Sequence, residues 1–177
     1  MHLETKRLFV REFIIEDAQA MKNFASDEYI TKWLPDWCDC SEWIDDWINM
    51  VINHYTVNDP MKNFLAYAVV EKESNSLIGH IGCGAFEEFE EAEMGLCYVI
   101  NPAYANRGYT TEALNAFVGH LFDRYCYDYL IATIQPDNIA SIIVAKKIGF
   151  VFTKSIEIID NGQTEKLPFN YYRLHRI

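Results

Sequence analysis

The residues with the clearest chemical potential lie in "NPAYANRGYTTEALNAF", Asn101–Phe117, between a hydrophobic run that ends at Ile100 and an amphipathic run. A helix that begins near Gly108 would offer N–H groups without internal partners, and its dipole would add partial positive charge. Gly108 removes a side chain and Arg107 adds a charge, so the segment predicts a phosphate-binding loop. The alternative is that Gly108 relieves a tight turn and Thr110 caps the helix.

Two common nucleotide-binding motifs can be tested against these letters. A P-loop requires G-x-x-x-x-G-K-S/T, but no glycine stands five residues before Gly108 and no lysine follows it. A dinucleotide-binding loop requires G-x-G-x-x-G, which this segment also lacks. The segment therefore predicts a phosphate site of another kind.

Hydrophobic periodicity indicates which elements must hold this loop in place. The run Glu93–Ile100 is apolar almost throughout, which predicts a strand covered on both faces. In chain order the sequence predicts a strand at Arg7–Phe13, helices at Ile14–Asp27 and Ser41–Tyr55, a hairpin at Phe64–Phe86, the strand at Glu93–Ile100, a helix at Thr110–Tyr125, a strand at Tyr129–Ile134, a helix at Ser141–Ile148 that Asn138 starts and Gly149 ends, and a C-terminal hairpin around Asp160–Gln163.

This order of elements predicts an α+β fold with a mixed sheet. A strand–helix–strand crossover joins Glu93–Ile100 to Tyr129–Ile134, so we expect these two strands to be parallel and the hairpin strands antiparallel. No linker, repeat or low-complexity segment interrupts the chain. We therefore expect a single domain over residues 1–177.

Composition narrows the range of partners. The 26 acidic residues against 15 basic ones argue against a general nucleic-acid surface, because phosphate neutralisation needs clustered Lys and Arg. No apolar run approaches the roughly 20 residues of a membrane span. The five cysteines are an odd number and favour reduced thiols, so we expect a cytoplasmic protein. Cys38 and Cys40 lack a second pair of ligands at zinc-site spacing, so no metal is expected.

Three segments together resemble the GNAT acetyltransferase superfamily and its RimJ/RimL-type branch. They are "LETKRLFVREFIIEDA" near the N-terminus, "EMGLCYVINPAYANRGYTTEAL" around the loop and "PDNIASIIVAKKIGF" further along the chain. The resemblance spans Leu3 to Phe150. It implies a strongly twisted mixed sheet with flanking helices, in which two central parallel strands splay apart and acetyl-CoA lies in the gap.

The resemblance also implies which residues bind acetyl-CoA. Backbone N–H groups do not depend on side-chain identity, so the pyrophosphate should bind at the loop although Ala105 and Thr110 depart from the family motif Q/R-x-x-G-x-G/A. Arg107 would supply the charge that Ala105 cannot. Asn138 could instead be only a helix N-cap, and Ser141 only a small helix residue. The implied cofactor-binding residues are Ala105, Asn106, Arg107, Gly108, Tyr109 and Thr110 in the loop, Tyr98, Val99 and Ile100 along the pantetheine arm, and Asn138 and Ser141 near the sulfur.

The implied reaction is attack of a neutral amine on the thioester. A primary amine with a pKa near 10.4 is neutral in only about one molecule in 10³ to 10⁴ at pH 7, so a base would help. Glu93 is the candidate base, and its alternative role is as a solvated member of the acidic run that follows Phe86. The family's tyrosine acid corresponds to Ala145 here, which leaves Ser141 or a bound water as its substitute. Cys97 has no His at readable spacing, which favours direct transfer.

The acceptor should enter beside the tryptophan-rich stretch "WLPDWCDCSEWIDDW", where aromatic faces and carboxylates would suit a cationic amine. The alternative is an amphipathic helix with core aromatics and a solvated acidic face. The leading hypothesis is an acetyl-CoA-dependent N-acetyltransferase that acts on a protein N-terminus or a small amine. Two alternatives are a non-catalytic acyl-CoA-binding or sensor domain and a structural interaction module. The oligomeric state, including a homodimer, stays open.

Overall fold

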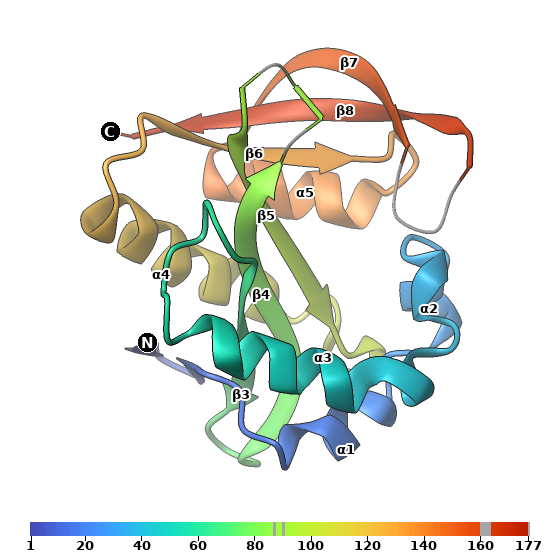
Figure 1. The fold of residues 1–177 in the computed structure, drawn as a ribbon, viewed down its shortest axis with the longest axis vertical. Helices are drawn as coiled ribbons and strands as arrows, with labels where there is room; N and C mark the ends of the chain where they lie inside the picture. The colour runs from blue at the N-terminus through green and yellow to red at the C-terminus, as the bar shows by residue number, and fades with distance from the viewer. Residues whose placement is uncertain (87, 90, 160–163, 177) are drawn as a thin grey trace.

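The computed structural model describes residues 1–86, 88–89, 91–159 and 164–176, so the predicted turn at Asp160–Gln163 lies outside the described residues. Its strands form one sheet (Figure 1). From edge to edge the order is β1 (His2–Glu4), β2 (Leu8–Arg11), β3 (Leu65–Glu71), β4 (Ser76–Phe86), β5 (Glu93–Ile100), β6 (Tyr129–Ile134), β8 (Lys166–His175) and β7 (Val151–Ile159).

The sheet is antiparallel except between β5 and β6, so the predicted mixed α+β sheet is confirmed. These two parallel strands meet at one register pair, Gly95 with Ile131. On its other edge β5 pairs with β4 along its whole length, from Glu93 to Ile100. The central strands therefore separate beyond Gly95, as the splayed arrangement requires.

Side chains of β3 alternate between two cores, because successive residues of a strand point to opposite faces. Leu65, Tyr67 and Val69 pack in the core that includes α4 (Tyr109–Arg124). Ala66, Ala68 and Val70 pack in the core that includes α1 (Asp17–Lys22) and α3 (Cys40–His54). The small alanines let α3 cross close in front of β3 and β4 (Figure 1).

Of the two helices predicted before β3, the second is confirmed as α3 to within one residue at each end, whereas the first is shorter than the sequence pattern suggests. The predicted helix at Ile14–Asp27 ends with α1 at Lys22, and a separate short helix, α2 (Glu28–Thr31), begins where the Asp27 carboxylate accepts a hydrogen bond from the Tyr29 N–H. The later helix α5 (Ile139–Ile148) begins after Asn138 and ends at Gly149, whose φ of 107° is the left-handed geometry that glycine accommodates. Both predicted ends of that helix are confirmed.

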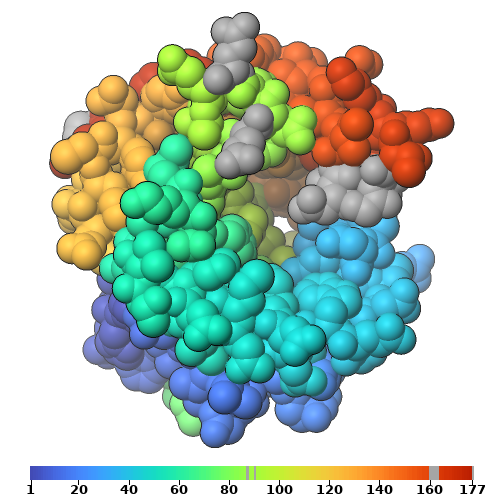
Figure 2. Space-filling model, in the orientation of Figure 1, coloured from blue at the N-terminus to red at the C-terminus, as the bar shows by residue number. Residues whose placement is uncertain are grey.

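The separation of β5 and β6 leaves the molecule hollow between the sheet and residues 28–34 (Figure 2). We call these residues, which are α2 and the three positions after it, the α2 segment. Within the described residues, no helix is long and apolar enough to cross a bilayer. All five cysteines are free thiols.

Candidate functional site

A cavity of about 550 Å³ occupies the gap between the splayed strands. Its floor is β5, and its sides are α5, the α2 segment and the loop that connects β5 to α4. Among its lining residues are ten of the residues predicted to bind acetyl-CoA: Tyr98, Val99, Ile100, Ala105, Asn106, Gly108, Tyr109, Thr110, Asn138 and Ser141. The structure therefore brings these residues, which span 44 positions of sequence from Tyr98 to Ser141, around one space.

Gly108 is required by the backbone rather than by crowding. It stands at the N-terminus of α4 with a φ of 79°, and Asn106 also has a positive φ, of 61°. A Cβ built on Gly108 would meet only one atom closer than 4 Å, Nη2 of Arg7 at 3.6 Å. Gly108 is the N-cap of α4, in place of the predicted Thr110. The first N–H groups of α4, which have no partner within the helix, follow directly after it.

Arg7 braces this loop from outside the cavity. Its Nε donates to Oε2 of Glu112 at 2.7 Å, and its Nη1 donates to the carbonyl of Arg107 at 3.0 Å. The guanidinium also lies 4.2 Å from the centroid of the Tyr109 ring. Burial works to raise the pKa of Glu112, but hydrogen bonds from Thr5 and Arg7 outweigh burial and hold this pKa below its usual value.

The basic side chain that lines the cavity is not the one that the sequence predicts. Arg107 is exposed, lies 5.4 Å from the Tyr104 ring centroid and is absent from the described lining of the cavity. Lys147 of α5 lines the cavity instead. The spacing Ala140, Val144 and Lys147 places these three residues on one helix face, a pattern that could have identified this lysine from the sequence.

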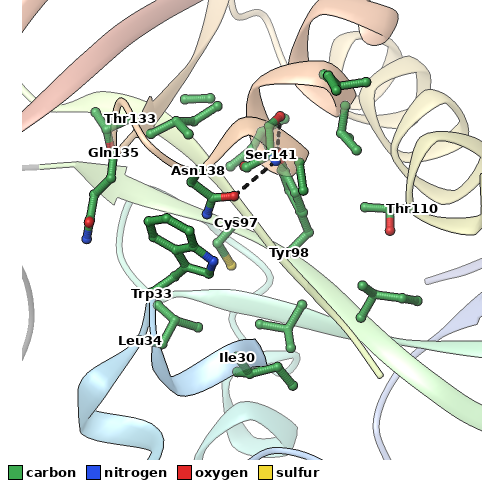
Figure 3. A pocket seen from close by; sticks show the side chains of 18 of the residues that line it. Ile30, Trp33, Leu34, Cys97, Tyr98, Thr110, Thr133, Gln135, Asn138 and Ser141 are labelled. Carbon is green, nitrogen blue, oxygen red and sulfur yellow. Dashed lines mark hydrogen bonds between the residues drawn. The ribbon is translucent and has the colours of Figure 1, made fainter. Parts of the chain in front are cut away.

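Tyr98 and Ser141 join β5 to α5 across the cavity (Figure 3). The Tyr98 hydroxyl lies 2.6 Å from the Ser141 Oγ and donates to the Ser141 carbonyl at 3.1 Å. Asn138 caps α5 by accepting the Ser141 N–H at 3.1 Å, so its N-cap role is observed while it also lines the cavity. Burial raises the pKa of Tyr98 to about 12, which keeps the phenol protonated near neutral pH.

Glu93 is held in a cluster of donors and is not among the lining residues of the cavity. Its carboxylate accepts from Tyr129 at 2.6 Å, from Tyr171 at 2.8 Å and from Nη2 of Arg173 at 2.9 Å. The side chain is only 11% exposed, so it is not a solvated member of the acidic run either. These contacts favour a structural role that ties β5 to β6 and β8.

Two other residues of the predicted mechanism are Cys97, which is half-buried and lines the cavity, and Ala145, which is buried. Burial raises the pKa of Cys97 to about 12, which keeps its thiol protonated and disfavours a covalent acetyl-enzyme. Ala145, at the position of the family's tyrosine, is 2% exposed and packs in the core. Within the described residues no group of His, Cys, Asp and Glu side chains could hold a metal ion.

The four tryptophans divide between the cavity and the core. Trp33 lines the cavity, whereas Trp37 stacks on His80 with ring centroids 5.4 Å apart and contacts Trp43 and Trp47 edge to face. His80 is 2% exposed, and burial lowers its pKa to about 4. For Trp37, Trp43 and Trp47 the core-aromatic interpretation is therefore the right one, and the cation-binding interpretation is not supported.

A helix N-terminus beside two splayed parallel strands, with a cavity between them, is the arrangement that the resemblance to acetyltransferases implies. The chain belongs to the acetyltransferase (GNAT) domain family, whose model matches residues 7–151. It is 34% identical over 149 residues to the uncharacterized N-acetyltransferase YnaD of Bacillus subtilis (strain 168), covering 84% of this chain and 82% of that protein.

Solved structures share the whole fold. An acetyltransferase of the GNAT family from Bacillus anthracis superimposes with a TM-score of 0.82 at 27% identity, covering 99% of this chain and 98% of that one. RimL, a ribosomal L7/L12 α-N-protein acetyltransferase in complex with coenzyme A, superimposes with a TM-score of 0.79 at 16% identity, with the same coverage. Family membership supports acetyl-CoA as the acyl donor.

Proposed function

We propose that this protein is an N-acetyltransferase of the RimJ/RimL-type branch that transfers the acetyl group of acetyl-CoA directly to a primary amine in a ternary complex. The observation that carries the proposal is the continuous cavity from the Gly108 loop to the Tyr98–Ser141 pair. The amine nitrogen forms a bond to the acetyl carbon, the carbon–sulfur bond breaks, and the amine proton leaves to water or to the thiolate.

The loop would bind the pyrophosphate of acetyl-CoA. Backbone N–H groups at residues 106–110, which include the start of α4, supply donors and partial positive charge, whereas the Ala105 N–H already donates to the Pro102 carbonyl. Lys147 adds a full positive charge from α5. We assign this charge to Lys147 rather than to Arg107, because only Lys147 lines the cavity.

The free edge of β5 would hold the pantetheine arm. In the described part of the chain, Leu96–Ile100 pair with β4 on one side and have no strand partner on the other. Unpaired strand N–H and C=O groups bind an extended chain by adding it as a further strand. An N–H of this edge would also polarise the acetyl carbonyl as negative charge develops on its oxygen.

Tyr98 and Ser141 would stabilise the departing thiolate by hydrogen bonding. A thiol has a pKa near 8.5 and Tyr98 one of about 12, so full proton transfer from Tyr98 would be uphill by about 5 kcal/mol. A hydrogen bond to the thiolate has no such cost. This role replaces the acid that Ala145 cannot supply. It does not remove the amine proton, which goes to water or to the thiolate.

A second candidate function is a non-catalytic acyl-CoA sensor, favoured by the engagement of Glu93 and by the buried Ala145. Calorimetry with acetyl-CoA and a thiol-release assay with a panel of amines separate the two functions. We expect binding together with amine-dependent release of CoA thiol. Tight binding without turnover on any peptide, amino-acid amide or polyamine would favour the sensor. The five free thiols support our assignment of the protein to the cytoplasm.

A further inference from the structure

The end of the cavity away from the Gly108 loop has an aromatic wall. We use this name for five lining side chains that come from the α2 segment, from the residue before β3, and from β4 and β8: Tyr29, Trp33, Phe64, Phe86 and Phe169. Ile30 and Leu34 project beside Trp33 from the α2 segment into the same space (Figure 3). Four separate parts of the chain thus contribute apolar or aromatic surface to one end of the cavity.

The described lining of this end includes no carboxylate. Among the described residues that line the cavity, Lys147 is the one charged side chain, and it comes from α5. The outer side of the wall carries a positive charge, because the exposed Lys32 holds its ammonium 4.6 Å from the centroid of the Trp33 ring. Glu93, the predicted base, lies outside the described lining and already accepts hydrogen bonds from three donors.

These surroundings select the charge state of the acceptor. An ammonium group that leaves water for an apolar site without a carboxylate is strongly destabilised, whereas a neutral amine is not. A second ammonium on the same molecule would meet this penalty again. The aromatic wall therefore favours an acceptor with an apolar body. It disfavours an acceptor that carries a charge besides the reacting nitrogen.

We propose that the acceptor is a single amine on an aromatic or apolar body, that it binds in its neutral form, and that a second positive charge on it is excluded. The inference rests on the proposed acetyl transfer and names its substrate class. It also explains how transfer proceeds without a carboxylate base, since the site takes up an amine that has already lost its proton in solution.

Amines with a low pKa follow as the best acceptors. At pH 7 an α-amino group with a pKa near 8 is neutral about 200-fold more often than an alkylamine with a pKa near 10.4. The favoured acceptor is therefore an α-amino group next to an aromatic or apolar side chain, on a peptide or on a small amide. Polyamines and lysine side chains should be poor acceptors.

The test compares acceptors that differ in one feature, with kcat/KM measured by release of CoA thiol. Norleucinamide and lysinamide share the α-amino group and the carbon chain and differ in the second ammonium, so we expect norleucinamide to be favoured by at least about tenfold. Phenylalaninamide should exceed alaninamide. Equal or better use of lysinamide would overturn the inference while leaving acetyl transfer intact. Acetyl-CoA binding with no turnover on any amine would instead overturn the proposed function, and the inference with it.

A substitution in the wall tests the same point from the protein side. Tyr29 is 41% exposed and its side chain makes no described hydrogen bond, so Tyr29→Glu adds a carboxylate with little risk to folding. We expect the lysinamide to norleucinamide ratio of kcat/KM to rise several-fold, with Tyr29→Gln as the uncharged control. An unchanged ratio, with acetyl-CoA affinity preserved in both variants, contradicts a charge-selective wall.

Discussion

The two ends of the cavity are built by different chemistry. At the Gly108 loop the functional groups are backbone N–H donors, fixed by two positive φ angles and by the hydrogen bonds of Arg7. At the aromatic wall the functional groups are side chains, and the backbone only carries them. Substitutions in the loop should therefore leave acetyl-CoA binding intact wherever the new residue can adopt the local φ. Substitutions in the aromatic wall should instead change which acceptor binds, without changing the fold.

The two ends also differ in what lies beneath them. The loop rests on charged groups, Arg7 and Glu112, which are satisfied by each other. The segment that carries Trp33 continues into Trp37, which stacks on the buried His80, whose Nδ1 has no hydrogen-bond partner among the described residues. Acid should therefore act on the two ends through different residues and in different pH windows.

The largest effect is expected from protonation of His80. Its pKa is about 4 in the folded state against about 6.5 when unfolded, so the unfolded state binds more protons between these values. Stability from this residue should fall as pH drops from 6.5 to 4, by about 3 kcal/mol in total. Denaturant unfolding of wild type and His80→Leu across this range measures the difference. His175→Leu, at an exposed histidine, is the control. Parallel curves for wild type and His80→Leu would refute the assignment.

The next largest effect is expected from Gly108→Val. A β-branched residue at a φ of 79° strains the loop by about 1–3 kcal/mol, so acetyl-CoA affinity should fall by up to about 100-fold. Gly119→Val is the matched control, because a Cβ there meets nothing within 4 Å. Calorimetry measures both. Equal affinities in the two variants would remove the loop from the cofactor site.

Removal of the hydroxyl in Tyr98→Phe or in Ser141→Ala should lower kcat by about 10- to 50-fold, the loss of one hydrogen bond to developing charge. Acetyl-CoA affinity should change little. Because the pKa of Tyr98 is about 12, the loss should be the same from pH 6 to 9. Tyr127→Phe, outside the cavity lining, is the control. Loss of stability with unchanged kcat would make the pair structural.

The smallest effect is expected from Arg7→Gln, which removes the brace without touching the cavity. The partly exposed Arg7–Glu112 pair contributes modestly, so acetyl-CoA affinity should fall only about fivefold. The lowered pKa of Glu112 means that its contribution is present above about pH 4.3 and is lost as pH falls further. Glu112→Gln should weaken this acid dependence of the melting temperature. A full loss of binding in Arg7→Gln would mean that Arg7 contacts the cofactor directly.

The sequence predicts the loop end better than the wall, because the loop signals are local. Gly108 and Asn138 act through their own backbone or through residues three positions away, and a pattern of neighbours reveals such roles. The hairpin pairs and the parallel pair of β5 and β6 also follow from local signals, namely turns and one crossover. The strand β1 and the place of β8 between β6 and β7 were not predicted. Helix boundaries before β3 were less accessible, since Asp27 restarts the chain as a new helix inside one continuous apolar pattern.

The remaining roles depend on contacts between distant residues. Glu93 accepts hydrogen bonds from Tyr129, Tyr171 and Arg173, which lie 36 to 80 positions away in the sequence. No spacing in the sequence indicates these contacts. The aromatic wall likewise brings together Tyr29 and Phe169, which are far apart in the sequence and meet only in the folded protein. Chemistry that depends on such contacts becomes visible only in three dimensions.

The single register pair between β5 and β6 has a consequence for folding cooperativity. The sheet consists of two smaller sheets, β1–β5 and β6–β8, which are connected by the single register pair of Gly95 and Ile131. An extended ligand arm in the gap would act as the missing strand and would couple the unfolding of the two parts. Amide exchange along Tyr98–Ile100 should slow when acetyl-CoA binds, and the two parts should then melt as one unit.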